Sequence, residues 1–112
     1  MRYRFFPAAD KRQDEIWDYT LRKWGEPKAV EYISGIHDAI SRAAENPQLW
    51  RRLDRRGFEK VFYIRYEKHF IFFRGLSRGI LGIISILHER MDIPTRLKED
   101  LKAYNTIERQ TP

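Results

Sequence analysis

Cysteine, long apolar runs and metal-ligand histidine spacing are all missing from this chain of 112 residues. Without cysteine, neither a disulfide framework nor a thiolate metal site can form, which fits the cytoplasm. Residues 1–9 contain no continuous apolar core, so no signal peptide is expected. The longest apolar run, Ile80–Leu87, is far shorter than the roughly 20 residues that cross a bilayer. The three histidines show no metal-ligand spacing. The sequence therefore predicts a cytoplasmic protein without membrane span, metal or cofactor.

The formal charge of +6 is concentrated in one part of the chain. Residues 1–47 hold eight basic and eight acidic side chains, residues 48–92 hold ten and five, and residues 93–112 hold four and three. An arginine-rich loop follows the first half and carries Arg51, Arg52, Arg55, Arg56 and Lys60. A basic surface favours nucleic acid, a nucleoprotein target or an acidic partner peptide. A merely solvated loop is the plain alternative, and the sequence does not choose between them.

Apolar spacing in the first half predicts a short strand followed by a helical hairpin. The strand covers residues 3–6, and the first helix runs from residue 8 or 9 to Trp24, where Gly25 suits a left-handed helix end. The second helix begins near Pro27 and ends at Asn46-Pro47. Its apolar stripe is spaced 4, 3, 4, 3 and consists of Ala29, Ile33, Ile36, Ile40 and Ala43. The short link makes the two helices antiparallel.

The second half predicts three strands and a closing helix. The strands cover residues 58–66, 69–74 and 80–88, and the helix covers residues 94–104. The element order is then β-α-α-β-β-β-α, which indicates an α+β fold with an antiparallel sheet covered by the helical hairpin. Residues 1–104 form a single domain in this interpretation, and residues 105–112 form a polar, frayed tail.

One face of the first helix carries Trp17, Leu21 and Trp24 at positions i, i+4 and i+7. We expect these side chains to pack against the second helix, at Ile33, Ile36 and Ile40. Two helices on one face of a sheet cannot hide every aromatic side chain, however. The groove of the pair is therefore also a candidate dock for an amphipathic partner helix, because a bare apolar patch would promote association.

Polar groups are crowded where the last strand ends, in the segment Ile86-Leu87-His88-Glu89-Arg90-Met91-Asp92. His88 is a general base, a target contact or a structural histidine that bonds a nearby backbone, and these alternatives stay open. Arg90 suits either a salt bridge or recognition of phosphate or carboxylate. Asp92 is expected to cap the helix that opens at Pro94, and Met91 is expected in the core.

Four local patterns together resemble the RelE/ParE superfamily of toxins from type II toxin-antitoxin systems, and within it the ParE branch, over residues 3–101. They are Asp14–Tyr19 with Trp24-Gly25, Ala29 and Tyr32-Ile33 with Asn46-Pro47, His69–Arg74, and Ile86–Asp92. The resemblance implies a toxin that a ParD-like antitoxin holds inactive. It also implies inhibition of DNA gyrase by binding and stabilising its cleaved-DNA complex, so that nucleic acid is met only indirectly.

The sister branch, RelE-like, cleaves mRNA on the ribosome and needs cations beside the phosphate and a Tyr or His for proton transfer. In this chain the interferase arginine falls near His69, and the aromatic base falls near Pro94. The next tyrosine, Tyr104, lies on the core stripe of the closing helix. This incomplete set favours a binding toxin that is not an enzyme, with the mRNA interferase as the alternative. A member that only binds its antitoxin is a third interpretation.

Two sets of site residues follow from these interpretations. Candidates for antitoxin binding are Trp17, Leu21, Trp24, Ile33, Ile36 and Ile40. Candidates for target binding are His88, Arg90, Arg51, Arg52, Arg55 and Arg56.

Overall fold

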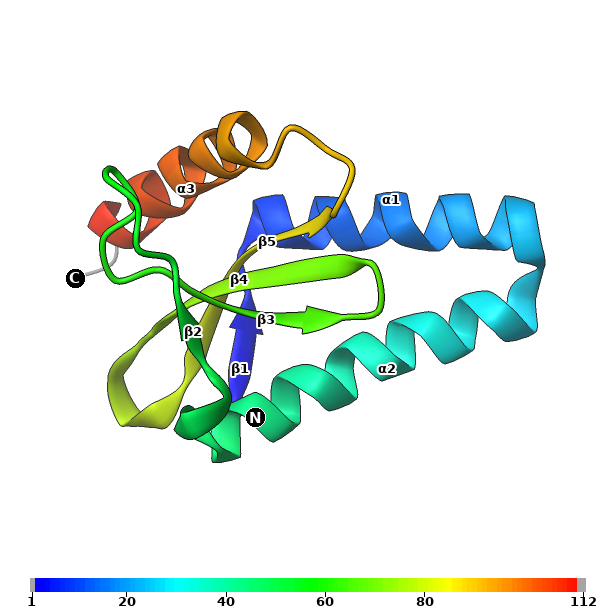
Figure 1. Ribbon diagram of the computed structural model, residues 1–112, viewed down its shortest axis with the longest axis horizontal. Helices are drawn as coiled ribbons and strands as arrows, with labels where there is room; N and C mark the ends of the chain where they lie inside the picture. The colour runs from blue at the N-terminus through cyan, green and yellow to red at the C-terminus, as the bar shows by residue number, and fades with distance from the viewer. Residues whose placement is uncertain (1, 111–112) are drawn as a thin grey trace.

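The computed structural model describes residues 2–110, and side chains as far as residue 108. Its elements, in chain order, are β1 (Tyr3–Phe5), α1 (Pro7–Trp24), α2 (Glu26–Glu45), η1 (Pro47–Leu49), β2 (Arg51–Arg52), β3 (Phe62–Tyr66), β4 (His69–Gly75), η2 (Ser77–Gly79), β5 (Leu81–His88) and α3 (Ile93–Gln110). Figure 1 shows these elements along the chain. The predicted order β-α-α-β-β-β-α and the α+β class are confirmed, with one short strand added.

The five strands form one mixed sheet in the order β1-β5-β4-β3-β2. Strands β3, β4 and β5 make the predicted antiparallel meander. Strand β1 joins it in parallel, with Tyr3 opposite Leu81, so the sheet is not purely antiparallel. The additional strand β2 lies inside the stretch predicted as a loop, where Arg51 and Arg52 pair with Tyr63 and Phe62.

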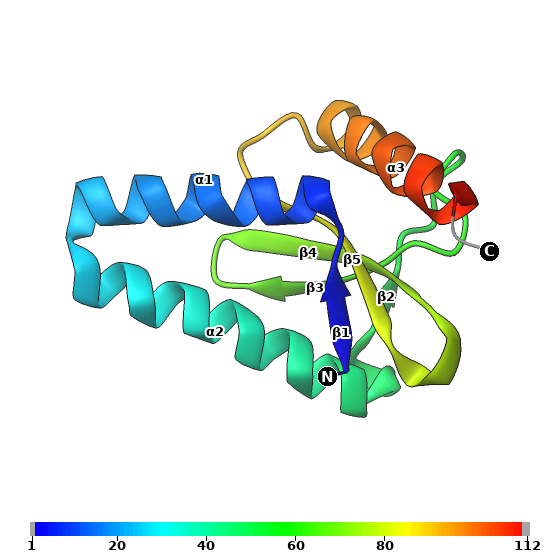
Figure 2. The ribbon, with the colours of Figure 1, turned by 180° about the vertical axis from the view of Figure 1, so that it is seen from behind.

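The helices cover both faces of the sheet, as Figures 1 and 2 show from opposite sides. Between the sheet and the α1–α2 hairpin lies a first core of Ala9, Ile16, Ile36, Ile40, Ala43, Ala44, Ile64, Ile71, Phe73, Leu81, Ile83 and Ile86. Between the sheet and α3 lies a second core of Phe6, Phe58, Val61, Phe72, Ile84, Leu87, Leu97, Leu101 and Tyr104. Because both faces of β5 are covered, its residues 81–87 are all buried, which explains the long apolar run.

A β-bulge on β5 sets which side chains face which core. Phe72 lies opposite Ser85 and Phe73 lies opposite Ile83, which leaves Ile84 as the extra residue. Ile83 and Ile86 therefore reach the same core despite their odd spacing. The bulge shifts the phase of the alternation along the strand.

A buried polar network ties the layers together. Arg12 of α1 donates through Nε to Oδ2 of Asp100 in α3 at 2.9 Å. Ser85 of β5 donates to the same oxygen at 2.6 Å. The hydrogen bond with Asp100 raises the pKa of Arg12, so the guanidinium stays charged. Asp100 is 7% exposed, and its carboxylate is paired with the Arg12 cation and accepts a hydrogen bond from Ser85.

Several predicted boundaries need correction. Helices α1 and α2 begin earlier than predicted, at Pro7 and Glu26. Strand β3 begins only at Phe62, because residues 58–61 turn while Phe58 and Val61 enter the second core. Helix α3 runs to Gln110, so residues 105–110 are not the predicted frayed tail, since Ile107 also packs against the second core. Residues 111–112 of that tail lie outside the described residues.

Candidate functional site

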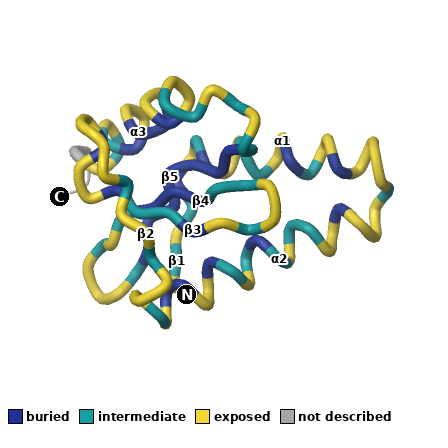
Figure 3. The backbone as a smooth tube through the Cα atoms, viewed as in Figure 1, coloured by how far each residue is buried: buried dark blue, intermediate teal, exposed yellow. Residues whose placement is uncertain are grey.

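The far end of the α1–α2 hairpin projects beyond the sheet (Figure 3) and carries exposed apolar side chains. We call this set the hairpin tip: Tyr19, Leu21, Trp24 and Val30. Trp24 is 63% exposed and Leu21 is 37% exposed, so the prediction that they pack in the core was wrong. The buried line of α1 runs instead through Ala9, Ile16 and Thr20. Thr20 fits there because its hydroxyl donates to the Ile16 carbonyl at 2.7 Å.

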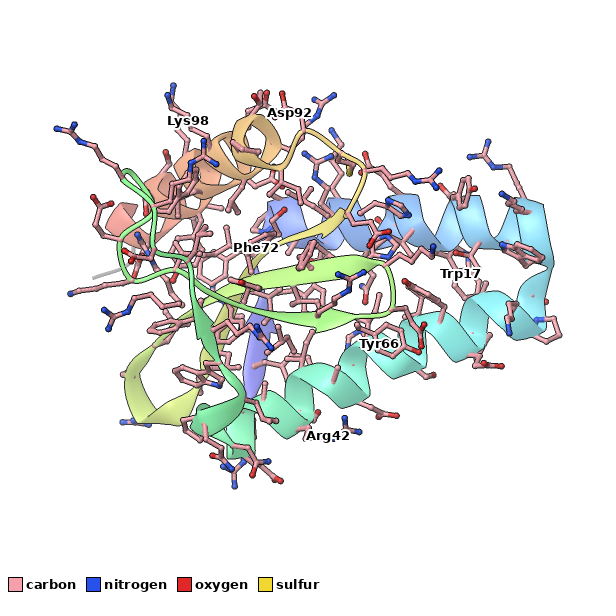
Figure 4. The ribbon with its side chains drawn as sticks, in the orientation of Figure 1. Trp17, Arg42, Tyr66, Phe72, Asp92 and Lys98 are labelled. Carbon is pink, nitrogen blue, oxygen red and sulfur yellow. The ribbon has the colours of Figure 1, made fainter. Side chains whose placement is uncertain are left out.

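The other predicted antitoxin-binding residues are covered to different degrees. Ile36 and Ile40 are fully buried under the sheet, so they belong to the core of the chain itself and cannot reach a partner in this conformation. Trp17 and Ile33 are half-buried, and Figure 4 shows Trp17 in the space between α1 and α2. Contact with a partner stays a prediction for Trp17, Leu21, Trp24 and Ile33.

At the end of β5, the polar segment forms a structural junction. The backbone N–H of Arg90 donates to Nδ1 of His88 at 3.0 Å, which is the structural role considered for this histidine. Asp92 caps α3 as predicted, because it accepts a 2.8 Å hydrogen bond from the Thr95 hydroxyl and a longer one from its N–H. Met91 packs against the second core, as predicted. Arg90 remains exposed.

A cluster of aromatic side chains joins α2 to the β3–β4 turn. The Tyr32 hydroxyl and Nδ1 of His69 share a hydrogen bond of 2.6 Å, and the ring of Tyr66 meets Tyr32 edge-on. Tyr66 reaches α2 (Figure 4) so closely that a Cβ on Gly35 would stand 1.9 Å from its hydroxyl oxygen. We call Tyr32, Gly35, Tyr66 and His69 the joint cluster.

The ionisation of the joint cluster is fixed by burial. Burial, assisted by the neighbouring His88, lowers the pKa of His69 to about 4. Burial also raises the pKa of Tyr32 to about 12. Both groups are therefore neutral at pH 7 and neither is poised for proton transfer. The sequence interpretation missed this cluster, although a glycine in the middle of a helix was a usable signal.

The arginine-rich loop borders two separate hollows rather than one surface. Arg51 lines a groove of about 320 Å³ between α2 and β3, which we call the α2 groove, together with Arg42, Arg65, Ala39, Ala43, Leu49 and Ile64. Arg55 and Arg56 line a cleft of about 310 Å³ beside the start of α3, which we call the α3 cleft, together with Gly57, Phe58, Pro94, Thr95 and Lys98. Arg52 is exposed on β2. Lys98 was not among the predicted site residues.

Tyr104, the tyrosine that follows the position of the interferase aromatic base, is not accessible. Tyr104 is 1% exposed, and burial raises its pKa to about 12. Its hydroxyl lies against Gly82 and therefore cannot act as an exposed base. Within residues 2–110, no cluster of three or more histidine or acidic side chains is arranged to hold a metal ion. No helix in that range combines the length and apolar character that crossing a membrane requires.

Comparison with known proteins gives a consistent result. Residues 3–93 match the model of a family described as ParE toxin of type II toxin-antitoxin system, parDE. Toxin ParE1 of Mycobacterium tuberculosis is 37% identical over 98 residues, which cover 86% of this chain and 97% of that protein. Toxin ParE of Escherichia coli is 32% identical over 84 residues, 75% of this chain and 81% of that protein.

Among solved structures, a chain of the chromosomal ParDE TA system from P. aeruginosa superposes with a TM-score of 0.64. The match covers 79% of this chain and 95% of that chain, at 17% sequence identity. At that identity, the likeness concerns the fold.

Proposed function

The chain belongs to the ParE toxin family of type II toxin-antitoxin systems, and we propose that it inhibits DNA gyrase by binding until a ParD-like antitoxin neutralises it. A toxin of this class has an antitoxin as its partner. Two parts of the proposal rest on the resemblance to the family: gyrase as the target and a ParD-like protein as the antitoxin. Since gyrase acts on chromosomal DNA, the proposal places the protein in the cytoplasm.

The exposed hairpin tip supports action by binding. Trp24, Leu21 and Val30 are exposed apolar side chains of one projecting element, and exposed apolar patches mark interaction sites. By contrast, the histidine and tyrosine side chains that could transfer a proton are engaged or buried: His88 accepts a backbone hydrogen bond, His69 is held neutral, and Tyr104 is inaccessible. The engagement and burial of these proton-transfer candidates is the observation that favours a binding toxin over an mRNA interferase.

A gyrase supercoiling assay with purified toxin tests the target. We expect saturating toxin to stop supercoiling and to trap cleaved DNA. Normal supercoiling without trapped cleavage would remove gyrase from the proposal. In a translation extract, mRNA should stay intact; codon-positioned cleavage that Arg90→Ala abolishes would instead establish the interferase alternative.

The hairpin tip is the proposed antitoxin surface, with Trp17 and Ile33 at its edge. Trp24→Ala should weaken binding of a ParD-like antitoxin at least tenfold, because a large exposed aromatic ring is a typical binding hot spot. The matched control is Leu49→Ala, an apolar side chain that is 45% exposed at the opposite end of the hairpin. Equal affinity of wild type and Trp24→Ala, measured by calorimetry, would move the antitoxin away from the tip.

A further inference from the structure

We propose that the α3 cleft binds the phosphate backbone of double-stranded DNA directly, through Arg55, Arg56 and Lys98. The three cations come from two segments far apart in sequence, the arginine-rich loop and the first turns of α3, and line one hollow of about 310 Å³. Figure 4 shows Lys98 extending outward from α3. This inference deepens the proposed action on gyrase, because it gives the toxin its own contact with the DNA of the target complex.

The cations of the α3 cleft are not neutralised from within the protein. The ion pairs found among the described residues join other side chains: Arg12, Lys28, Arg65 and Arg96 supply the cations. Arg55, Arg56 and Lys98 are all exposed, and no side-chain hydrogen bond of theirs occurs in the described part of the chain. Glu59, an acid of the same loop, accepts from the backbone N–H of Gly57. Asp92 is engaged with the Thr95 hydroxyl at the edge of the cleft, and none of the three cations forms an ion pair among the described residues, which favours an anionic ligand.

The loop that presents the two arginines is held in place. Phe58 and Val61 anchor it in the second core, and the backbone N–H of Leu53 donates to the Val61 carbonyl at 2.9 Å. Arg74 donates to the Glu59 carbonyl at 2.8 Å and to Oδ1 of Asn105 in α3 at 2.9 Å. The loop and α3 are thereby fixed to each other, so the cleft is formed before any ligand arrives.

The composition of the cleft favours phosphate over an acidic peptide. The large exposed apolar side chains of the described residues lie at the hairpin tip or at Leu49, which lines the α2 groove, and none borders the α3 cleft. A bound peptide normally draws much of its affinity from apolar anchors, whereas phosphate contacts need only charge and guanidinium geometry.

Duplex DNA fits the cleft better than a single strand. Proteins that hold single strands stack bases on exposed aromatic rings. The aromatic side chain of the cleft, Phe58, is only 6% exposed and belongs to the second core. A site with cations and no stacking platform reads a backbone rather than bases, as sequence-independent contacts to a duplex do.

Fluorescence anisotropy with a labelled random-sequence duplex of about 20 base pairs tests the inference, with the full-length wild-type toxin and no other protein. At low salt we expect micromolar affinity, the range of non-specific binding. The triple variant Arg55→Ala/Arg56→Ala/Lys98→Ala should bind at least tenfold more weakly. Its plot of log affinity against log salt should be shallower by about two to three units, since each phosphate contact contributes about 0.9.

The matched control removes the same net charge elsewhere. Lys11→Ala/Arg22→Ala/Lys28→Ala changes three exposed cations of the α1–α2 hairpin and should leave the salt slope unchanged. Circular dichroism establishes that both triple variants fold. The inference is overturned if the wild type does not bind duplex, if the two triple variants lose equal affinity, or if single-stranded RNA of equal length binds more tightly than the duplex. A cleft variant that loses an acidic antitoxin peptide and keeps DNA also overturns it.

The test separates the two proposals. A wild type that binds duplex through the cleft but leaves supercoiling intact contradicts the gyrase target alone. A toxin that traps cleaved DNA with gyrase, and whose cleft variant traps it equally well, contradicts the DNA-contacting cleft alone.

Discussion

The base and the tip of the α1–α2 hairpin are made of the same two helices, yet they use their apolar side chains differently. At the base, Ile16, Ile36 and Ile40 are buried against the sheet. At the tip, Leu21, Trp24 and Val30 face solvent beyond the β3–β4 turn. Burial of apolar area stabilises a fold in proportion to the area removed from water, so only the base contributes strongly to folding. The tip is free to serve a partner.

The joint cluster lies at the boundary between these two regions. Tyr32 and Gly35 of α2 meet Tyr66 and His69 of the β3–β4 turn. Beyond this point α2 extends past the sheet, and its positions there are mostly exposed (Figure 3), with Ala29 as a buried exception. The cluster therefore fixes the direction in which the tip projects.

The strongest test of the comparison is Ile36→Ala at the base. The side chain is fully buried, and its truncation leaves a cavity, so we expect the free energy of unfolding to fall by about 2–5 kcal/mol. Val30→Ala, an exposed position on the same helix, should change it by less than about 0.5 kcal/mol. Urea unfolding followed by tryptophan fluorescence measures both. Similar losses at the two positions would abolish the distinction between base and tip.

Gly35→Ala probes the boundary itself. The new methyl group would collide with the Tyr66 ring, so we expect a loss of about 1–3 kcal/mol, although alanine is the better helix former by about 1 kcal/mol. A double-mutant cycle with Tyr66→Ala should recover much of this loss, because the collision partner is gone. Additive effects in the cycle would show that the contact does not set the fit between α2 and the turn.

The next largest effect should come from acid, which lowers the stability that His69 contributes to the joint cluster. In the folded state the pKa of His69 lies near 4, below its ordinary value of 6.5, so the unfolded chain binds more protons between these values. Stability from this group is complete above about pH 6.5 and is lost as the pH falls towards 4. Allowing for partial exposure, we expect a loss on the order of 1–2 kcal/mol relative to His69→Phe. Urea unfolding of both proteins from pH 7.5 to pH 4.5 measures the difference, and a constant difference would contradict the assignment.

The smallest expected change in stability comes from Trp24→Ala. Tryptophan is the largest side chain, but the Trp24 ring is mostly exposed. Its truncation should therefore alter the free energy of unfolding by less than about 0.5 kcal/mol. Thermal unfolding measures the shift. A large destabilisation would mean that the tip supports the fold and is not reserved for a partner.

Sequence periodicity was sufficient for the element order and for α2, whose stripe of Ile36, Ile40 and Ala43 is buried as predicted. The same periodicity predicted the wrong buried face for α1, because it assigned the helix face with the largest apolar side chains to the core. Trp17, Leu21 and Trp24 form the bulkier stripe, but the sheet ends before the far part of the helix, and the buried line passes through Thr20. How far a helix extends beyond its sheet is a tertiary property that no local pattern contains.

The site shows the same division. The cap at Asp92 was predictable because a capping side chain acts on its own next turn. Lys98 and Arg55 lie in one cleft only because the loop and α3 meet over the second core, and the pairing of His69 with Tyr32 depends on the angle of the hairpin. The two-residue strand β2, made of Arg51 and Arg52, exists because Tyr63 and Phe62 lie beside it, since arginine pairs carry no strand signal of their own.

The parallel pairing of β1 with β5 has a consequence for protein synthesis. Tyr3 finds its neighbour only when Leu81 has been made, and at about 5–20 residues per second the N-terminal strand waits roughly 4–16 seconds for it. Until then the sheet lacks its most buried strand and both cores lack one wall. The nascent chain therefore acquires its folded surfaces late in translation, and a chain truncated before Leu81 leaves β1 without a partner.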